Sequence, residues 1–125
     1  MKYIFPVALS LFIISCYQNK TSSNCDSLNF LQDTIFINKI PIGDSIVVKF
    51  KFFNECDAPI KIVNVGSSCG CTVGDYSKES INKGDSGLVR VTYKNGNDTG
   101  RIIRTLVVES DGQRKLTPLY ILTHE

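Results

Sequence analysis

The amino-acid sequence predicts an all-β protein that folds as an antiparallel β-sandwich of about seven strands. Apolar and polar residues alternate in several short segments, which is the period of a strand with one buried face. Clusters of turn-forming residues separate these segments at the spacing typical of a sandwich. No segment keeps the 3.6-residue apolar period of an amphipathic helix. These three observations define the predicted fold class.

The clearest strand pattern lies in residues 46–52. Ile46, Val48, Phe50 and Phe52 share one face of this segment, whereas lysines occupy two positions on the other face. The alternation predicts a strand that is buried on one side only. Similar patterns predict further strands at residues 60–65, 88–93, 101–110 and 119–123.

Glycine, asparagine and aspartate mark the turns between these strands, at residues 42–44, 54–57, 83–85, 95–98 and 111–112. Glycine favours turns because it adopts left-handed backbone conformations, and Asn and Asp do so because their side chains bond to nearby backbone groups. Pro118 falls inside the last predicted strand. Because proline has no backbone N–H to donate, we expect Pro118 at a sheet edge or at a bulge.

The amino-terminal segment, residues 1–15, has the features of a lipoprotein signal peptide. Lys2 precedes an apolar run over residues 3–14 that is too short to cross a bilayer about 30 Å thick as a helix. The run ends in I-I-S-C, which resembles the lipobox of bacterial lipoproteins. On this resemblance Cys16 becomes the first residue of the mature chain and carries the lipid. The alternative is an ordinary secretory peptide with an incidental cysteine.

A polar segment follows, and we expect residues 16–29 to form the lipidated end and a flexible tether. Residues 30–125 are then the sandwich domain, which is long enough for one core. This organisation predicts a protein of the cell envelope, held in the membrane by its lipid and facing the periplasm or the cell surface. The membrane and an unidentified envelope protein are the expected partners.

Charge and motifs exclude several other functions. The formal net charge is +2, and removal of Lys2 leaves +1, so no basic field for nucleic acid is expected. Ser67 and Ser68 have no nearby base, and no G-x-S-x-G elbow, spaced acidic pair or phosphate-binding glycine loop is found. We therefore expect a protein that is not an enzyme, with no evident small-molecule substrate.

Four sequence blocks resemble a known bacterial family. They are F-I-N-K-I-P-I-G-D-S-I-V-V-K-F-K-F-F-N, A-P-I-K-I-V-N-V-G-S-S-C-G-C-T-V, I-N-K-G-D-S-G-L-V-R-V-T-Y and G-R-I-I-R-T-L-V-V-E-S. In this order they are similar to the family known as domain of unknown function 1573, over roughly residues 30 to 123. The resemblance implies an immunoglobulin-like sandwich, similar to modules of adhesion and ciliary scaffold proteins, with no established activity. A shared fold does not confer a shared function.

Two cysteines depart from the family pattern, and we expect them to form a disulfide. Cys56 stands in a turn where a small residue such as glycine is usual, and Cys25 lies outside the matched blocks. If the first strand runs antiparallel to the strand ending near Asn54, both cysteines lie at one end of the sandwich. Cys69 and Cys71 would then lie at the opposite end. The alternative for Cys25 and Cys56 is a pair of free thiols in an oxidising compartment.

The segment Cys69-Gly70-Cys71 allows four interpretations. The residues form a structural bend at Gly70, a strained and easily reduced disulfide, a redox pair, or part of a site for Cu(I) or zinc. A structural zinc site needs four ligands, and His124 is the one histidine of the chain.

The function that these features favour is a lipid-anchored, non-catalytic binding or scaffolding module without a cofactor. The alternative is an exported thiol- or metal-handling protein that uses Cys69 and Cys71, with Cu(I) or zinc as its metal.

Overall fold

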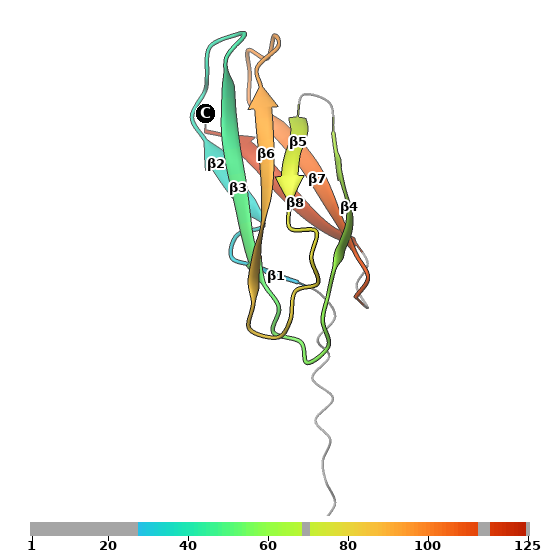
Figure 1. The fold of residues 1–125 in the computed structure, drawn as a ribbon. Helices are drawn as coiled ribbons and strands as arrows, with labels where there is room; N and C mark the ends of the chain where they lie inside the picture. The colour runs from blue at the N-terminus through green and yellow to red at the C-terminus, as the bar shows by residue number, and fades with distance from the viewer. Residues whose placement is uncertain (1–27, 69–70, 113–115, 125) are drawn as a thin grey trace, which may run out of the picture.

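The computed structural model describes residues 28–68, 71–112 and 116–124. In this part of the chain every regular element is a β-strand, and no helix is long and apolar enough to span a membrane. The strands are drawn in Figure 1 and are β1 (Asn29–Phe30), β2 (Thr34–Ile37), β3 (Ser45–Phe53), β4 (Ile62–Ser67), β5 (Cys71–Tyr76), β6 (Ser86–Lys94), β7 (Ile103–Ser110) and β8 (Leu116–Thr123).

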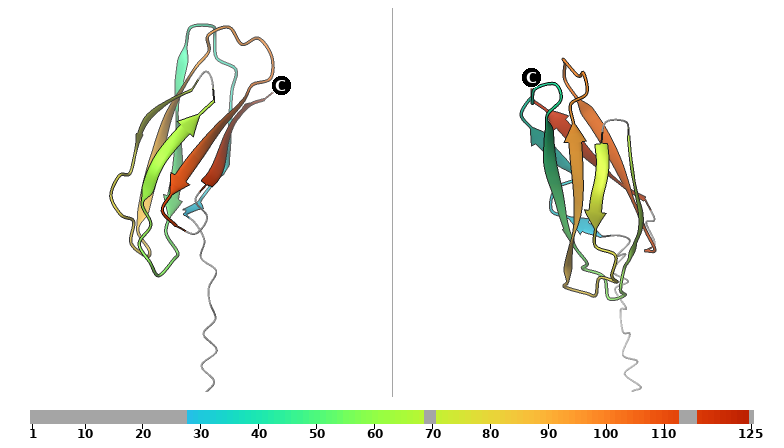
Figure 2. Two further views of the ribbon diagram at one scale, coloured as in Figure 1. Left: turned by 90° about the vertical axis from the view of Figure 1, so that its right-hand side faces the viewer. Right: turned by 45° about the horizontal axis from the view of Figure 1, so that its top comes forward.

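The strands form two four-stranded sheets that pack face to face (Figure 2). The first sheet has the order β1-β3-β6-β5 and the second the order β2-β8-β7-β4. This architecture confirms the predicted all-β sandwich. One pairing differs from the prediction, because β2 runs parallel to β8, whereas the other neighbours are antiparallel. The chain crosses from β1 in the first sheet to β2 in the second, and this crossing brings β2 beside β8 in the same direction.

The core lies between the sheets and follows the predicted alternation. In β3 the inward residues Val48, Phe50 and Phe52 are buried, and the lysines between them are exposed. Burying one large apolar side chain stabilises a domain by about 1.5–3 kcal/mol. The other strands contribute further side chains that are almost fully buried, namely Val89, Val91, Tyr93, Leu106, Val108, Leu119 and Ile121.

Pro118 lies in the first part of β8, where the strand is paired on one side only. It pairs with Val107 of β7, whereas β2 joins β8 only from Tyr120, whose N–H donates to the Asp33 carbonyl at 2.7 Å. Backbone groups two residues apart point to the same side of a strand. The nitrogen of Pro118 therefore faces the side of β8 where β2 has not yet begun, so the missing N–H interrupts neither described ladder.

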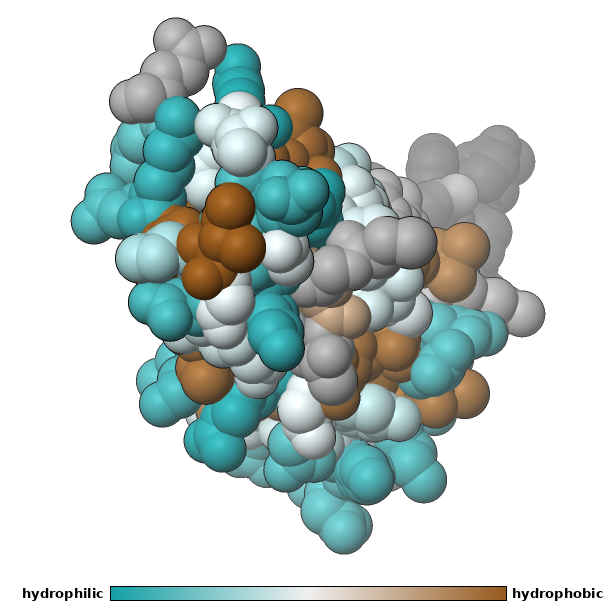
Figure 3. Space-filling view, turned by 90° about the horizontal axis from the view of Figure 1, so that it is seen from above, coloured by the Kyte–Doolittle hydropathy of each residue, from teal (hydrophilic) through white to brown (hydrophobic). Residues whose placement is uncertain are grey.

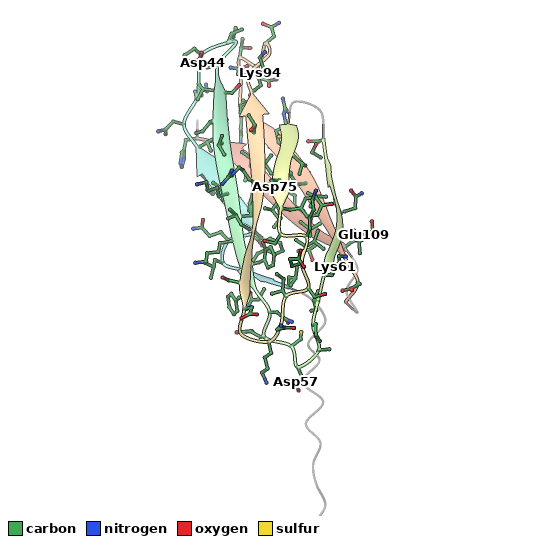
Figure 4. All side chains as sticks on the ribbon, viewed as in Figure 1. Asp44, Asp57, Lys61, Asp75, Lys94 and Glu109 are labelled. Atoms are coloured by element: carbon green, nitrogen blue, oxygen red, sulfur yellow. The ribbon has the colours of Figure 1, made fainter. Side chains whose placement is uncertain are left out.

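The sandwich has two distinct ends. Figure 4 shows Asp57, in the turn between β3 and β4, at one end, and Asp44 and Lys94 at the other. The end of β4 and the start of β5 lie towards the second end, as does the end of β8 (Figure 1). Figure 3 looks onto this second end, where hydrophilic residues surround a few hydrophobic ones. The described cysteines, Cys56 and Cys71, therefore lie towards opposite ends, as the sequence predicts.

Candidate functional site

The candidate site is the rim of the sandwich around Cys71, the first residue of β5. Cys69 and Gly70 lie outside the described residues, so the structure does not test the bend at Gly70 or a bond between the two thiols. Cys16 and Cys25 also lie outside them. Of the predicted site residues, Cys56 and Cys71 are described, and the fold keeps them apart.

Cys71 is held by backbone pairing and is half-buried. It pairs with Tyr93 of β6, and its carbonyl accepts a hydrogen bond from the Ser67 hydroxyl at 3.0 Å. Burial raises the pKa of the Cys71 thiol above its usual value of 9.0, and the positive charge of Arg104 opposes this shift only in part. Because the thiolate is the form that attacks substrates and binds metals, Cys71 is a weak nucleophile and a weak ligand at neutral pH.

Three polar side chains meet beside Cys71. Arg104 of β7 donates from Nη2 to Oδ2 of Asp98 at 2.5 Å, and the Tyr93 hydroxyl donates to the same oxygen at 3.0 Å. The Arg104 guanidinium also lies over the Tyr93 ring, 5.8 Å from its centroid. These contacts link the two sheets at the rim, since Tyr93 belongs to the first sheet and Arg104 to the second.

The network changes the acidity of its members. Burial, together with the hydrogen bond to Asp98, raises the pKa of Tyr93 to about 12, so the phenol stays neutral at physiological pH. The hydrogen bonds from Tyr93 and Arg104 lower the pKa of Asp98 below its usual 3.8. Nε of Arg104 is buried and has no hydrogen-bond partner among the described residues. The cluster therefore keeps the Asp98 carboxyl ionised and the Tyr93 hydroxyl protonated at neutral pH.

Acid should weaken this network. The carboxylate of Asp98 has a lower pKa in the folded chain than in the unfolded chain, so the stability that it contributes is present above pH 3.8 and is lost as the pH falls through the lowered value. Thermal unfolding of wild type and Asp98→Asn, followed between pH 7 and pH 2, measures this loss. The stability difference between the two proteins should shrink towards pH 2, and a difference that stays constant would contradict the assignment.

Sequence reasoning missed this cluster, although one feature of the sequence indicates it. Arg104 is in phase with Leu106 and Val108, which the alternation of residues 101–110 places on the inner face. A charged residue at an inward position needs a partner of opposite charge, because burying an unpaired charge is costly. The position of Asp98, in the turn six residues earlier, was not predictable without the fold.

The described residues do not assemble a metal site at Cys71. They contain no group of three or more His, Cys, Asp or Glu side chains placed to hold an ion. His124, the one imidazole that the sequence offers, stacks on Phe36 of β2 with the ring centroids 5.0 Å apart. β2 is the edge strand of the second sheet opposite to β4, whereas Cys71 lies beside β4. The fold therefore separates His124 from Cys71.

Ser67 and Ser68 close the turn at this rim. Oγ of Ser68 accepts a hydrogen bond from the Thr105 N–H at 3.1 Å, and the Ser68 N–H donates to the Thr105 carbonyl at 2.9 Å. The two hydroxyls thus contact backbone groups of β5 and of β7, respectively. Two shallow hollows on the described surface lie over β5 and β6 and between β2 and β3, and Cys71 lines neither of them.

The opposite end is organised by Asn54, beside Cys56. The Asn54 amide donates to the carbonyls of Ala58 at 2.9 Å and Ile81 at 2.8 Å, and its oxygen accepts from the Cys56 N–H at 2.8 Å. Asn54 is completely buried and Cys56 is nearly so. The side chain of Asn54 thereby ties the turn after β3 to the chain before β6, and it fixes the backbone that positions Cys56.

Solved structures with a similar fold come from unrelated contexts. The secreted serine protease VesC from Vibrio cholerae matches with a TM-score of 0.60 and 16% sequence identity. This match covers 78% of the present chain and 22% of the protease chain, so the present chain spans about a fifth of the protease. A protein of unknown function from Porphyromonas gingivalis W83 matches with a TM-score of 0.65 and 11% identity, over 86% of this chain and 51% of that one.

The ASH/PapD-like domain 7 of human CEP192 matches with a TM-score of 0.58 and 10% identity, over 81% of this chain and 86% of that domain. At such low identities the likeness shows the fold alone, which is an immunoglobulin-like sandwich. Among curated protein sequences, none matches this chain. The resemblance found in the sequence is confirmed, because the profile of one family covers most of the chain. That family is described as "Protein of unknown function (DUF1573)", it matches residues 28–124, and the chain belongs to it.

Proposed function

We propose that this chain is a lipid-anchored, non-catalytic module of the cell envelope that binds or scaffolds other envelope proteins. The observation that carries the proposal is the place where the chain enters the domain. Leu28 is buried, and Nδ2 of Asn29 donates to Oε2 of Glu55 at 3.1 Å, so the chain enters at the end that holds the turn after β3. A tether attached there leaves the opposite end and both outer faces free for a partner.

The length of the tether suits this arrangement. Residues 16–27, which precede the first described residue, would span about 20 Å as a flexible chain. A lipid at Cys16 would hold the domain at the membrane, since each buried CH₂ contributes about 0.8 kcal/mol and more than one acyl chain gives stable anchoring. The module would then face the periplasm or the cell surface.

The chemistry of the rim supports a non-catalytic role. The Cys71 thiol is protonated at neutral pH, and the Tyr93 hydroxyl already donates to a carboxylate. Ser67 and Ser68 are committed to local hydrogen bonds. The hydroxyls of Tyr93, Ser67 and Ser68 therefore all have structural partners, which is typical of a surface that maintains its shape rather than one that transfers protons.

Replacement of Cys16 tests the anchor. In cells that are fed a labelled fatty acid, the wild-type chain should incorporate label and fractionate with membranes. Cys16→Ser should remain uncleaved and unlabelled, because the lipid attaches to the sulfur of that residue. Cys25→Ser is the matched control and should be labelled as strongly as wild type. Label on the Cys16→Ser chain would refute the anchor.

We also propose that Cys25 and Cys56 form a disulfide that fastens the tether to the domain. Only two residues lie between Cys25 and Leu28, which is packed at the end where Cys56 lies. A bridge closing a loop of about thirty residues stabilises a domain by roughly 3–4 kcal/mol in the chain-entropy account. Peptide mapping without reductant should recover a peptide with Cys25 joined to one with Cys56. A link from Cys25 to Cys71 would contradict the proposal.

A further inference from the structure

The outer face of the second sheet is unusually apolar. Five of the eight exposed large apolar residues in the described part of the chain lie on its strands. We call this surface the apolar face, and its members are Phe36, Ile103, Val107, Leu116, Pro118, Tyr120 and Leu122. Soluble domains rarely expose contiguous apolar patches of this kind unless the patch contacts a partner.

The strand register makes the apolar face continuous. Phe36 lies opposite Leu122, and Leu122 lies opposite Ile103, so the three side chains form one row across β2, β8 and β7. Val107 and Pro118 are opposite one another closer to the other end of the same strands. Side chains directly opposite on one sheet face have Cβ atoms about 4.5–5.5 Å apart. The residues therefore form a surface rather than scattered exposed positions.

The two outer faces of the sandwich differ in charge. In the described strands of the second sheet, Glu109 is the one charged residue at an outward position. The outer face of the first sheet carries Lys49, Lys51, Arg90 and Lys94 on β3 and β6. An anionic membrane would attract that basic face and not the apolar one. The apolar face therefore matches a partner that is itself nearly uncharged.

We propose that the apolar face binds the same face of a second copy of this chain, forming a twofold symmetric dimer. Two copies of one uncharged surface are complementary in charge, and Glu109 lies near the end of its strand, away from the centre of the face. Faces of two sheets pack about 10 Å apart with their strands inclined by about 30°. The dimer would extend this packing to four layers of strands.

The area of the face suits a weak dimer. Its strands have four, six, eight and eight residues, and at a rise of about 3.3 Å per residue and a spacing of about 4.8 Å they cover about 400 Å². Two such faces bury about 800 Å² in total, which is the size of a weak, transient interface. The inference does not depend on the lipid anchor, since it uses only the described sandwich.

The test is the mass of the full chain in solution. The protein is purified in a density-matched detergent, its free thiols are alkylated, and sedimentation equilibrium gives its mass. The wild-type chain should be a dimer at roughly 100 µM, the affinity range of a small interface. Ile103→Lys should halve the mass, because it places two like charges in the dimer interface, and the far-UV circular dichroism spectrum should stay unchanged.

Val47→Lys is the matched control, because Val47 is 51% exposed and Ile103 is 56% exposed, but Val47 projects from the first sheet. This variant should remain a dimer. Leu116→Lys, at the other end of the apolar face, repeats the test if Ile103→Lys does not fold, and it should also be monomeric. A monomeric wild type, a dimeric Leu116→Lys or Ile103→Lys, or a monomeric Val47→Lys would each overturn the proposal.

Discussion

Replacing Asn54 with alanine should destabilise the domain by about 3 kcal/mol and lower its melting temperature by roughly 10–20 °C. The completely buried amide of Asn54 makes three side-chain hydrogen bonds, to Ala58, Ile81 and Cys56. Alanine would leave the Cys56 N–H and the Ala58 carbonyl without this partner. The Ile81 carbonyl would keep only its hydrogen bond from the Ile60 N–H. An unsatisfied buried group costs about 1–3 kcal/mol. Thermal and denaturant unfolding followed by circular dichroism measure the loss.

The exposed Asn97 provides the control for this change. Asn97 lies in the turn after β6, so Asn97→Ala should alter stability by less than about 0.5 kcal/mol. Asn54→Asp should be almost as damaging as Asn54→Ala, because a carboxylate cannot donate to the two carbonyls. If Asn54→Ala unfolded at the wild-type temperature, the turn after β3 would not depend on the amide.

Gly87→Ala should destabilise the domain by about 3 kcal/mol through overpacking. Gly87 of β6 lies directly opposite Phe52 of β3. A Cβ at position 87 would clash with Cζ of the Phe52 ring and lie 2.8 Å from Oγ of Ser77. Phe52 is completely buried and its ring contacts Phe30 with centroids 5.2 Å apart, so the ring has little space to move.

A second substitution should partly rescue Gly87→Ala. Phe52→Leu removes the ring atoms that clash, at a cost of about 1–2 kcal/mol when it is made alone. The double variant should be more stable than the sum of the single effects predicts, by about 1–2 kcal/mol, because the two residues are in contact. Denaturant unfolding of the four proteins in this cycle measures the coupling.

Gly66→Ala is the control for a glycine within a strand. An added Cβ at this position of β4 meets no atom within 4 Å, so the change should be nearly neutral. Equal losses for Gly66→Ala and Gly87→Ala would show that backbone propensity, and not the Phe52 ring, causes the effect.

Much of the fold follows from residue pattern alone, and particular strands show why. In β3 the alternation of phenylalanine and lysine identifies both the strand and its buried face, because a strand presents successive side chains to opposite sides. The turn at residues 83–85 contains Gly84, whose φ of 83° requires the glycine that marks the turn in the sequence. The family resemblance likewise depended on local sequence, namely the order of the four blocks and the S-C-G-C-T segment within the second of them.

Other elements were not predictable in the same way. β5 (Cys71–Tyr76) contains the segment C-T-V-G-D-Y, and its register with β6 shifts between Val73 and Asp75, so a simple alternation is interrupted there. The parallel pairing of β2 with β8 joins segments more than eighty residues apart. Local sequence patterns specify which side of a strand is buried, but they do not specify its neighbour.

The fold class, the strands with regular alternation and the cysteines that merit testing could all be predicted, because each of these depends on local composition and spacing. Which side chains meet depends on the assembled fold. It placed His124 on Phe36 and away from Cys71, and it brought Asp98 and Arg104 together beside the Cys71 thiol. It also gathered apolar residues from β2, β7 and β8 on one face. The physical reason is that strand order and register are set by packing of the whole core, which no single segment encodes.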